Sequence, residues 1–105
     1  MDIGELKKQS DLSYDTAIAK RNALEKAHSR MVVVYQEHIF RADPEMICLV
    51  RTLKETADEF FVLDTNQNPV EITDPAEFLQ ILIERNQEAI NSYYRMSKTF
   101  EKRGG

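Results

Sequence analysis

The sequence predicts a mainly α-helical fold with two long helices, about 13–41 and 75–102, a shorter helix over 44–58 and a small β-hairpin over 60–73. Two observations predict this class. The 105 residues include only three Gly and three Pro, which argues against a β-rich or low-complexity chain. Apolar residues recur at three- and four-residue spacing along most of the chain, as they do on the buried face of a helix. A chain of this length is expected to form one domain over 1–105.

The first helix is expected to begin near Ser10–Ser13, where SDLS offers several N-cap residues, after a frayed segment over 1–10. Its apolar stripe comprises Tyr14, Ala17, Ile18, Leu24, Ala27, Met31, Val34, Tyr35 and Ile39. The run MVVVY over 31–35 leaves an alternative, because three consecutive β-branched residues would suit a short buried strand. No Gly, Pro or Asn lies near either end of this run to turn the chain, so we favour the helix.

Asp43 followed by Pro44 predicts the start of the second helix, since Asp is a strong N-cap and Pro lacks an N–H group that the first turn leaves unbonded. The apolar residues of this helix alternate steps of four and three: Met46, Val50, Leu53, Ala57 and Phe60, with Ile47 and Leu49 widening the face. Cys48 lies within the same run, and no His or cation flanks it. We therefore expect a buried structural thiol, without a partner for an internal disulfide.

The next segment, FFVLDTNQNPVEIT, has β-forming residues on both sides of a polar turn and predicts strands near 60–64 and 69–73. Pro69 is tolerated because it opens an edge strand. An isolated two-stranded hairpin is marginally stable, so its apolar side chains must pack on the helices or on another subunit: Phe60, Phe61, Val62, Val70 and Ile72.

The turn of this hairpin partly resembles a calcium-binding loop. Asp64, Asn66 and Asn68 match the first three ligand positions of such a loop. Pro69 stands in place of the required Gly, and Pro75 stands in place of the final Glu. We therefore interpret the segment as a turn, and not as a metal site.

Asp74 and Pro75 predict the start of the third helix, and Glu77 would complete a capping box with Asp74. The helix is expected to end near Lys102, before a frayed end over 103–105. Its apolar seam alternates steps of four and three over its entire length: Leu79, Ile83, Asn86, Ile90, Tyr93, Ser97 and Phe100, thickened by Phe78, Leu82 and Ala89. Asn86 within this seam either fixes the register of an oligomer or forms hydrogen bonds inside one subunit.

The predicted helix lengths indicate self-association. Each long helix spans roughly 42 Å and the short one roughly 23 Å, so the short helix cannot cover the long ones from end to end. We expect the remaining parts of the long seams to pack on other copies of the chain, as in a helical bundle or coiled coil. The residues expected at this interface are Leu79, Ile83, Asn86, Ile90, Tyr93 and Phe100, with Val32, Val33 and Val34 of the first helix.

The net charge of −4 is unevenly distributed. Residues 43–74 have two Lys or Arg against eight Asp or Glu, whereas each flanking segment has a net charge of +1. This acidic segment would repel phosphates and attract a basic partner protein, although it also fits a solvated face that keeps the protein soluble. The start MDIGELKK has no long apolar run, and we expect neither an export signal nor a membrane contact, and a location in the cytoplasm.

Motifs for catalysis and for cofactor or metal binding are not recognised. Gly4, Gly104 and Gly105 are too near the ends to form a phosphate-binding loop. His28 and His38 have no Cys or Glu cluster beside them that would complete a metal site. Glu84 and Glu88 share a helical face, but catalysis by paired carboxylates also needs a cleft. We expect no enzyme activity, no cofactor and no small-molecule substrate.

The last helix suggests an alternative function in nucleic-acid contact, because aromatic residues and cations interleave along it: Arg85, Tyr94, Arg95, Lys98 and Lys102. Cations near the C-terminal end of a helix are also favoured by the helix dipole alone. We therefore do not favour nucleic acid as a partner, and keep it as the alternative.

The stretch from Phe60 to Phe100, FFVLDTNQNPVEITDPAEFLQILIERNQEAINSYYRMSKTF, is similar to small helical proteins of large tailed bacteriophages and covers about 40 of the 105 residues. The resemblance implies a virion-assembly or DNA-packaging component, in the manner of a small terminase subunit whose helical hairpin multimerises, located in the host cytoplasm or the virion. This chain lacks the helix-turn-helix segment that precedes such a hairpin, and the resemblance assigns no site residues. Together with the residue patterns, it predicts a non-enzymatic homo-oligomeric assembly or adaptor protein.

Overall fold

The computed structural model describes the backbone of residues 3–104 and the side chains of residues 14–100. The elements follow in the order α1 (Ile3–Arg30), β1 (Val32–Tyr35), β2 (His38–Arg41), α2 (Pro44–Thr56), β3 (Phe60–Leu63), β4 (Pro69–Ile72) and α3 (Pro75–Gly104). The predicted mainly α-helical class with three helices is therefore confirmed. Two small antiparallel sheets are present where one hairpin was expected.

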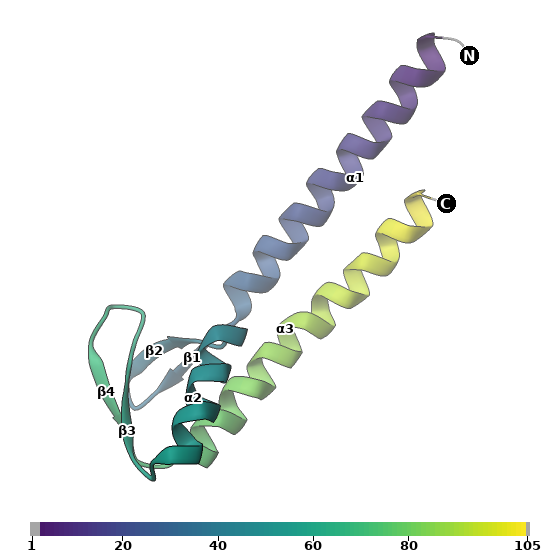
Figure 1. Ribbon diagram of the computed structural model, residues 1–105. Helices are drawn as coiled ribbons and strands as arrows, with labels where there is room; N and C mark the ends of the chain where they lie inside the picture. Colours follow the sequence, from purple (N-terminus) through teal and green to yellow (C-terminus); the bar gives the residue numbers. More distant parts are fainter. Residues whose placement is uncertain (1–2, 105) are drawn as a thin grey trace.

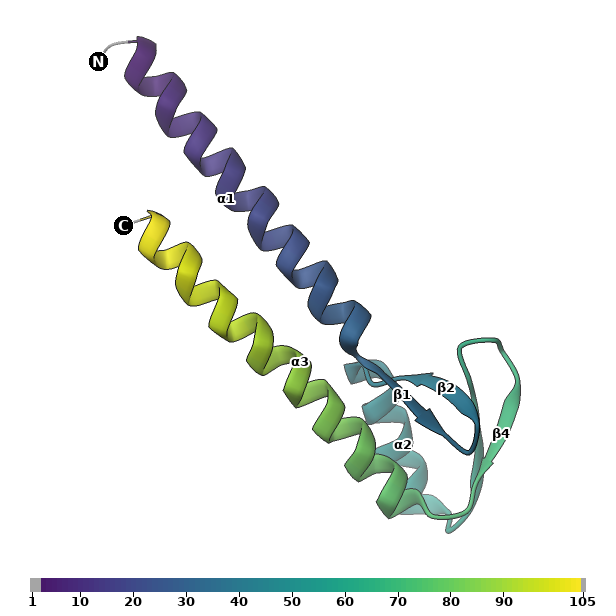
Figure 2. The ribbon, with the colours of Figure 1, turned by 180° about the vertical axis from the view of Figure 1, so that it is seen from behind.

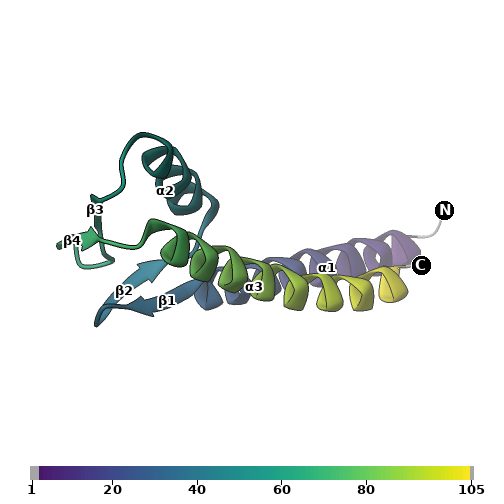
Figure 3. The same ribbon diagram turned by 90° about the horizontal axis from the view of Figure 1, so that it is seen from below.

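Helices α1 and α3 lie side by side and run in opposite directions, and we call this pair the stalk (Figure 1). The elements between them, over residues 31–74, gather at one end of the stalk and form the head (Figure 2). The molecule is accordingly elongated, with principal extents of 65 × 23 × 22 Å (Figure 3). Small side chains let the two helices approach closely, since Ala23 and Ala27 of α1 and Ala89 of α3 are all buried.

Helix α1 differs from its prediction at both ends. It begins at Ile3, before the expected start near Ser10–Ser13, and ends at Arg30. The parts of the expected frayed ends at 1–2 and 105 lie outside the described residues. The prediction of helix over 31–41 is wrong, and the strand alternative for 31–35 is correct: β1 pairs with β2, with Val33 opposite Phe40.

The turn of this first hairpin explains why its sequence did not predict it. Gln36 and Glu37 adopt φ angles of 52° and 67°, in the left-handed region. Two-residue hairpin turns require this conformation, and Asn and Gly are the residues that favour it. The chain has Gln and Glu there instead, so the usual turn signal is missing. The ladder of the hairpin and a hydrogen bond from the Ala42 N–H to the Met31 carbonyl at 2.8 Å hold the turn in place.

Helix α2 begins as predicted, with the Met46 N–H donating to Asp43 Oδ1 at 2.8 Å and Pro44 in the first turn. Val50 is fully buried, and Met46, Ile47 and Leu53 pack partly against the core. The prediction of a buried thiol at Cys48 is wrong, because its side chain is exposed. At 100° per residue, Cys48 lies about 160° around the helix from Val50, on the solvent side.

Strands β3 and β4 form the hairpin that the sequence predicts, with Phe60 opposite Ile72 and Val62 opposite Val70. These four residues are buried in the head. Phe61, which was also expected to pack, instead points outward and is 65% exposed. Alternation along a strand requires this, since neighbouring residues face opposite sides of the sheet.

The core lies in the head and against the first turns of α3. Phe40, Ile72, Phe78 and Leu82 are fully buried there. The Phe78 ring contacts Phe40 edge-on at 5.0 Å and Tyr35 at 4.8 Å between centroids. Burial, reinforced by the charge of Glu77, raises the pKa of Tyr35 above its ordinary value. Helix α3 is thus shared between head and stalk, and it starts as predicted, with the Glu77 N–H donating to Asp74 Oδ1 at 3.2 Å.

Candidate interaction surfaces

The side chains considered for metal binding or for paired-carboxylate chemistry are His28, His38, Glu84 and Glu88. Within residues whose placement is described, no group of three or more His, Cys, Asp or Glu side chains could hold a metal ion. His28 lies at the end of α1 and His38 in β2, so they belong to different elements. Glu84 accepts a hydrogen bond from Gln80, and Glu88 pairs with Arg85 on the exposed surface of α3.

Asp64 organises the turn between β3 and β4. Its Oδ1 accepts hydrogen bonds from the backbone N–H groups of Asn66 at 2.8 Å and Asn68 at 2.9 Å. Its Oδ2 lies 2.7 Å from His38 Nδ1 in the other hairpin. The hydrogen bond from Asn68 N–H is the largest cause of the lowered pKa of Asp64, opposed by burial and assisted by His38 and Asn66. The segment is a turn, as the sequence predicts. Both carboxylate oxygens of Asp64 are engaged in hydrogen bonds within the chain.

The contact between Asp64 and His38 is also the link between the two hairpins. A backbone hydrogen bond from the Thr65 N–H to the Ile39 carbonyl at 2.9 Å runs beside it. The two small sheets therefore meet at the turn of the second hairpin and at β2. Sequence patterns did not predict this pair, since the residues are 26 positions apart and His38 was assigned to a helix.

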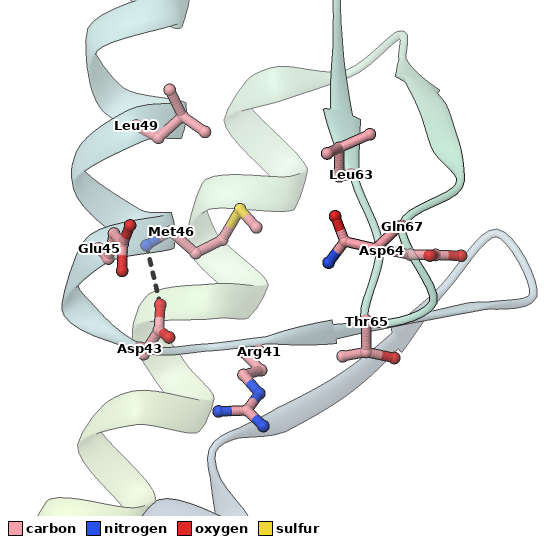
Figure 4. A pocket seen from close by; sticks show the side chains of 9 residues that line it. All are labelled: Arg41, Asp43, Glu45, Met46, Leu49, Leu63, Asp64, Thr65 and Gln67. Atoms are coloured by element: carbon pink, nitrogen blue, oxygen red, sulfur yellow. Dashed lines mark hydrogen bonds between the residues drawn. The ribbon is translucent and has the colours of Figure 1, made fainter.

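A groove of about 360 Å³ lies between α2 and the second hairpin. Its apolar part consists of Met46 and Leu49 of α2 and Leu63 of β3 (Figure 4). Its polar part consists of Arg41, Asp43, Glu45, Asp64, Thr65 and Gln67. Leu49 and Leu63 are 45% and 50% exposed. We call this feature the head groove.

The stalk has a second exposed apolar feature on α3. Leu79, Ile83, Ile90 and Tyr94 follow one another at steps of four, seven and four, and so share one face of the helix. Ile83 and Ile90 are 40% and 38% exposed, and Tyr94 is exposed as well. The buried residues Phe78, Leu82 and Ala89 lie about 100° away around the helix axis. We call this exposed face the α3 stripe.

The structure divides the predicted interface residues into two groups. Ile83, Ile90 and Val34 are exposed, whereas Leu79, Tyr93, Phe100 and Val32 are half-buried. Val33 is part of the core, and Asn86 is buried. The Asn86 side chain donates from Nδ2 to the Ala42 carbonyl at 3.0 Å and accepts from Gln87 at 3.1 Å. Of the two roles considered for Asn86, the hydrogen bonds inside one subunit are thus present.

The residues considered for nucleic-acid contact are partly used inside the chain. Arg85 donates from Nε to the Val32 carbonyl at 3.0 Å and pairs with Glu88 at 3.1 Å. Lys98 Nζ lies 4.9 Å above the ring of Tyr94. Arg95 is exposed on the same helix. The side chain of Lys102 lies outside the described residues.

A second groove, of about 550 Å³, lies beside Arg30 and Arg85, where the head meets the stalk. Arg30 donates a hydrogen bond to Ser92 Oγ at 2.7 Å there.

Comparison with protein-family models, curated proteins and solved structures finds no match for this chain. None of the helices over the described residues is long and apolar enough to span a membrane.

The head and the stalk differ in net charge. Residues 31–74, which form the head, have three Lys or Arg against nine Asp or Glu, a net charge of −6. The stalk helices have a net charge of +2 in α1 and +1 in α3. Copies of the head therefore repel one another, whereas copies of the stalk have only a small repulsion to overcome. Self-contact is electrostatically easier along the stalk.

Proposed function

We propose that this protein is a non-enzymatic homo-oligomeric assembly or adaptor protein, in which the stalks of neighbouring copies pack along the α3 stripe and the heads project to meet other components. The observation that carries this proposal is the α3 stripe itself. A two-helix stalk buries one face of each helix, and here the apolar surface of α3 continues onto a second face.

The α3 stripe has the spacing that helix–helix packing requires. Steps of four and seven place its residues along one line of the helix, where they can interdigitate with the same line of another copy. Contacts at Ile83 and Ile90 would be repeated in each subunit of a symmetric dimer. Burial of partly exposed isoleucine side chains stabilises by about 25 cal/mol per Å² of apolar area removed from water.

A role in phage virion assembly or DNA packaging is the context that the sequence resemblance suggests for such a subunit. Oligomers of helical hairpins suit that role because repeated stalk contacts generate rings or rods from one small chain. Nucleic-acid binding is the less favoured function, since Arg85 is already engaged with Val32 and Glu88.

The test is the molar mass of the wild-type protein and of the double variant Ile83→Ser/Ile90→Ser, measured by light scattering over a range of concentrations. We expect an oligomer for the wild type and a dissociation constant at least about tenfold weaker for the double variant. Phe61→Ser is the matched control, because it removes an exposed apolar side chain from the head and leaves the stalk unchanged. Equal masses for wild type and double variant would contradict the proposed interface.

A further inference from the structure

The head groove is a formed feature whose walls are held in place by internal hydrogen bonds. Asp43 caps α2 on one side through the Met46 N–H. Asp64 fixes the turn of the second hairpin on the other side through Asn66 and Asn68. A partner that enters the groove therefore meets preorganised walls, which lowers the entropic cost of binding.

The groove exposes two leucine side chains that do not belong to the buried core, Leu49 and Leu63. Leu63 lies on the outward face of β3, two residues from Phe61, which is also exposed. Leu49 lies on α2 outside the buried cluster around Val50. Figure 4 shows Met46 extending from α2 toward β3, between these two leucines. An apolar side chain of a partner would find contacts from both walls here.

The charge of the groove and its surroundings indicates the chemistry of that partner. Three carboxylates line the groove, Asp43, Glu45 and Asp64, against one cation, Arg41. Glu45 is exposed and pairs with no described residue, so it is available to a partner's cation. Six further exposed carboxylates lie outside the groove on the same head and add long-range attraction for a cation: Glu37, Glu55, Asp58, Glu59, Glu71 and Asp74. A second head, with the same net charge of −6, would be repelled.

We propose that the head groove binds a cationic amphipathic segment of a partner protein. One apolar side chain of the segment lies between Leu49 and Leu63, and a flanking Lys or Arg lies against Glu45. This arrangement combines an apolar anchor with electrostatic complementarity, which together give affinity and selectivity for the sign of the partner's charge. The inference is independent of contacts between stalks.

The test uses a fluorescent peptide of Leu and Lys that forms an amphipathic helix, titrated with the full-length protein and followed by anisotropy. A second peptide of the same pattern has Glu in place of Lys. We expect saturable binding of the Lys peptide, weakened as salt is added, and no binding of the Glu peptide. Absence of Lys-peptide binding at low salt would overturn the proposal.

Two matched pairs of variants locate the binding site. Leu63→Ser is compared with Val34→Ser, an exposed strand residue outside the groove, and Glu45→Gln is compared with Glu55→Gln, an exposed residue of the same helix. We expect Leu63→Ser to weaken binding about tenfold and Glu45→Gln about threefold, with little change for the two controls. All four are exposed positions, and circular dichroism checks that each variant folds.

Two other outcomes would overturn the proposal. Equal losses for Glu45→Gln and Glu55→Gln would mean that the peptide responds only to the overall acidity of the head. A lower molar mass for Leu63→Ser alone, without peptide, would mean that the groove is an interface between copies. If the stalk interface is wrong, the wild type and Ile83→Ser/Ile90→Ser will have equal masses, and peptide binding will be unchanged. The two proposals can therefore fail separately.

Discussion

The Asp64 side chain forms hydrogen bonds with three other residues of the head. It is buried, yet both of its carboxylate oxygens accept hydrogen bonds, from Asn66, Asn68 and His38. A buried carboxylate is stable only when its oxygens are satisfied in this way. The charged form is therefore favoured in the folded protein, and the pKa of Asp64 is lowered.

The lowered pKa of Asp64 predicts a specific acid response. A carboxyl group whose pKa is lower in the folded than in the unfolded chain contributes stability above its unfolded pKa, about 4. That contribution is lost as the pH falls through the folded pKa. We expect the melting temperature of the wild type to fall more steeply below about pH 4 than that of Asp64→Asn, which lacks the charge. Parallel pH profiles for the two proteins would contradict this role of Asp64.

Asn86 offers a second test at the scale of one residue. Asn86→Leu removes the hydrogen bond to the Ala42 carbonyl and leaves that buried acceptor without its side-chain donor. We expect a loss of about 1–3 kcal/mol in the free energy of unfolding, measured by urea denaturation. Because Asn86 is satisfied inside the chain, the oligomer number is expected to stay the same. A change of molar mass in this variant would instead assign Asn86 to the interface between copies.

The first hairpin is the element that shows most clearly what sequence patterns can and cannot predict. The β-branched run at Val32–Val34 signals a strand, but the turn residues Gln36 and Glu37 give no turn signal. Tertiary contacts decide between helix and strand here: Phe40 and Val33 are buried together in the core. Such contacts join residues that no local window compares.

Other elements were predictable because their signals are local. The caps at Asp43 and Asp74 depend on side chains that bond the backbone three residues further on. The second hairpin was predictable from its polar turn and flanking β-formers. The prediction of a buried Cys48 was wrong because membership of an apolar run does not tell which side chains face the core, and only one face of α2 meets it.

The α3 stripe and the head groove differ in how much of each could be predicted from the sequence. The spacing of apolar residues predicted that α3 has an apolar face. Which of these residues are buried and which form the α3 stripe depends on where α1 packs. The head groove joins residues from β2, α2, β3 and the following turn. These residues are separated in sequence, so no local motif predicts the groove. Only the excess of acidic residues in 43–74 indicated a docking surface.

The turn of the first hairpin gives a prediction at the scale of an element. Gln36→Asn together with Glu37→Gly places in the turn the residues that favour positive φ angles. We expect the free energy of unfolding to rise by about 0.5–1 kcal/mol, because less strain is stored in the turn. Thermal melting measures the change. A lower melting temperature would contradict the hairpin at 32–41.

At the scale of the whole molecule, the α3 stripe and the head groove lie on different parts of an elongated shape. The α3 stripe begins beside the acidic head, where Leu79 packs against the core, and continues along the stalk to Tyr94. The head and the stalk differ in the sign of their net charge. The proposed self-association along the stalk would leave the head groove accessible to a cationic partner. Such a subunit would join copies of itself through the stalk and a different protein through the head.

The molar mass of the wild-type protein in solution is the direct test of self-association through the stalk. Multi-angle light scattering at tens of micromolar, where a weak interface is populated, is the suitable measurement. We expect a mass at least twice that of the 12.2 kDa chain, reduced toward the mass of one chain in Ile83→Ser/Ile90→Ser. A wild-type protein that remains a 12.2 kDa monomer over this range would contradict self-association through the stalk.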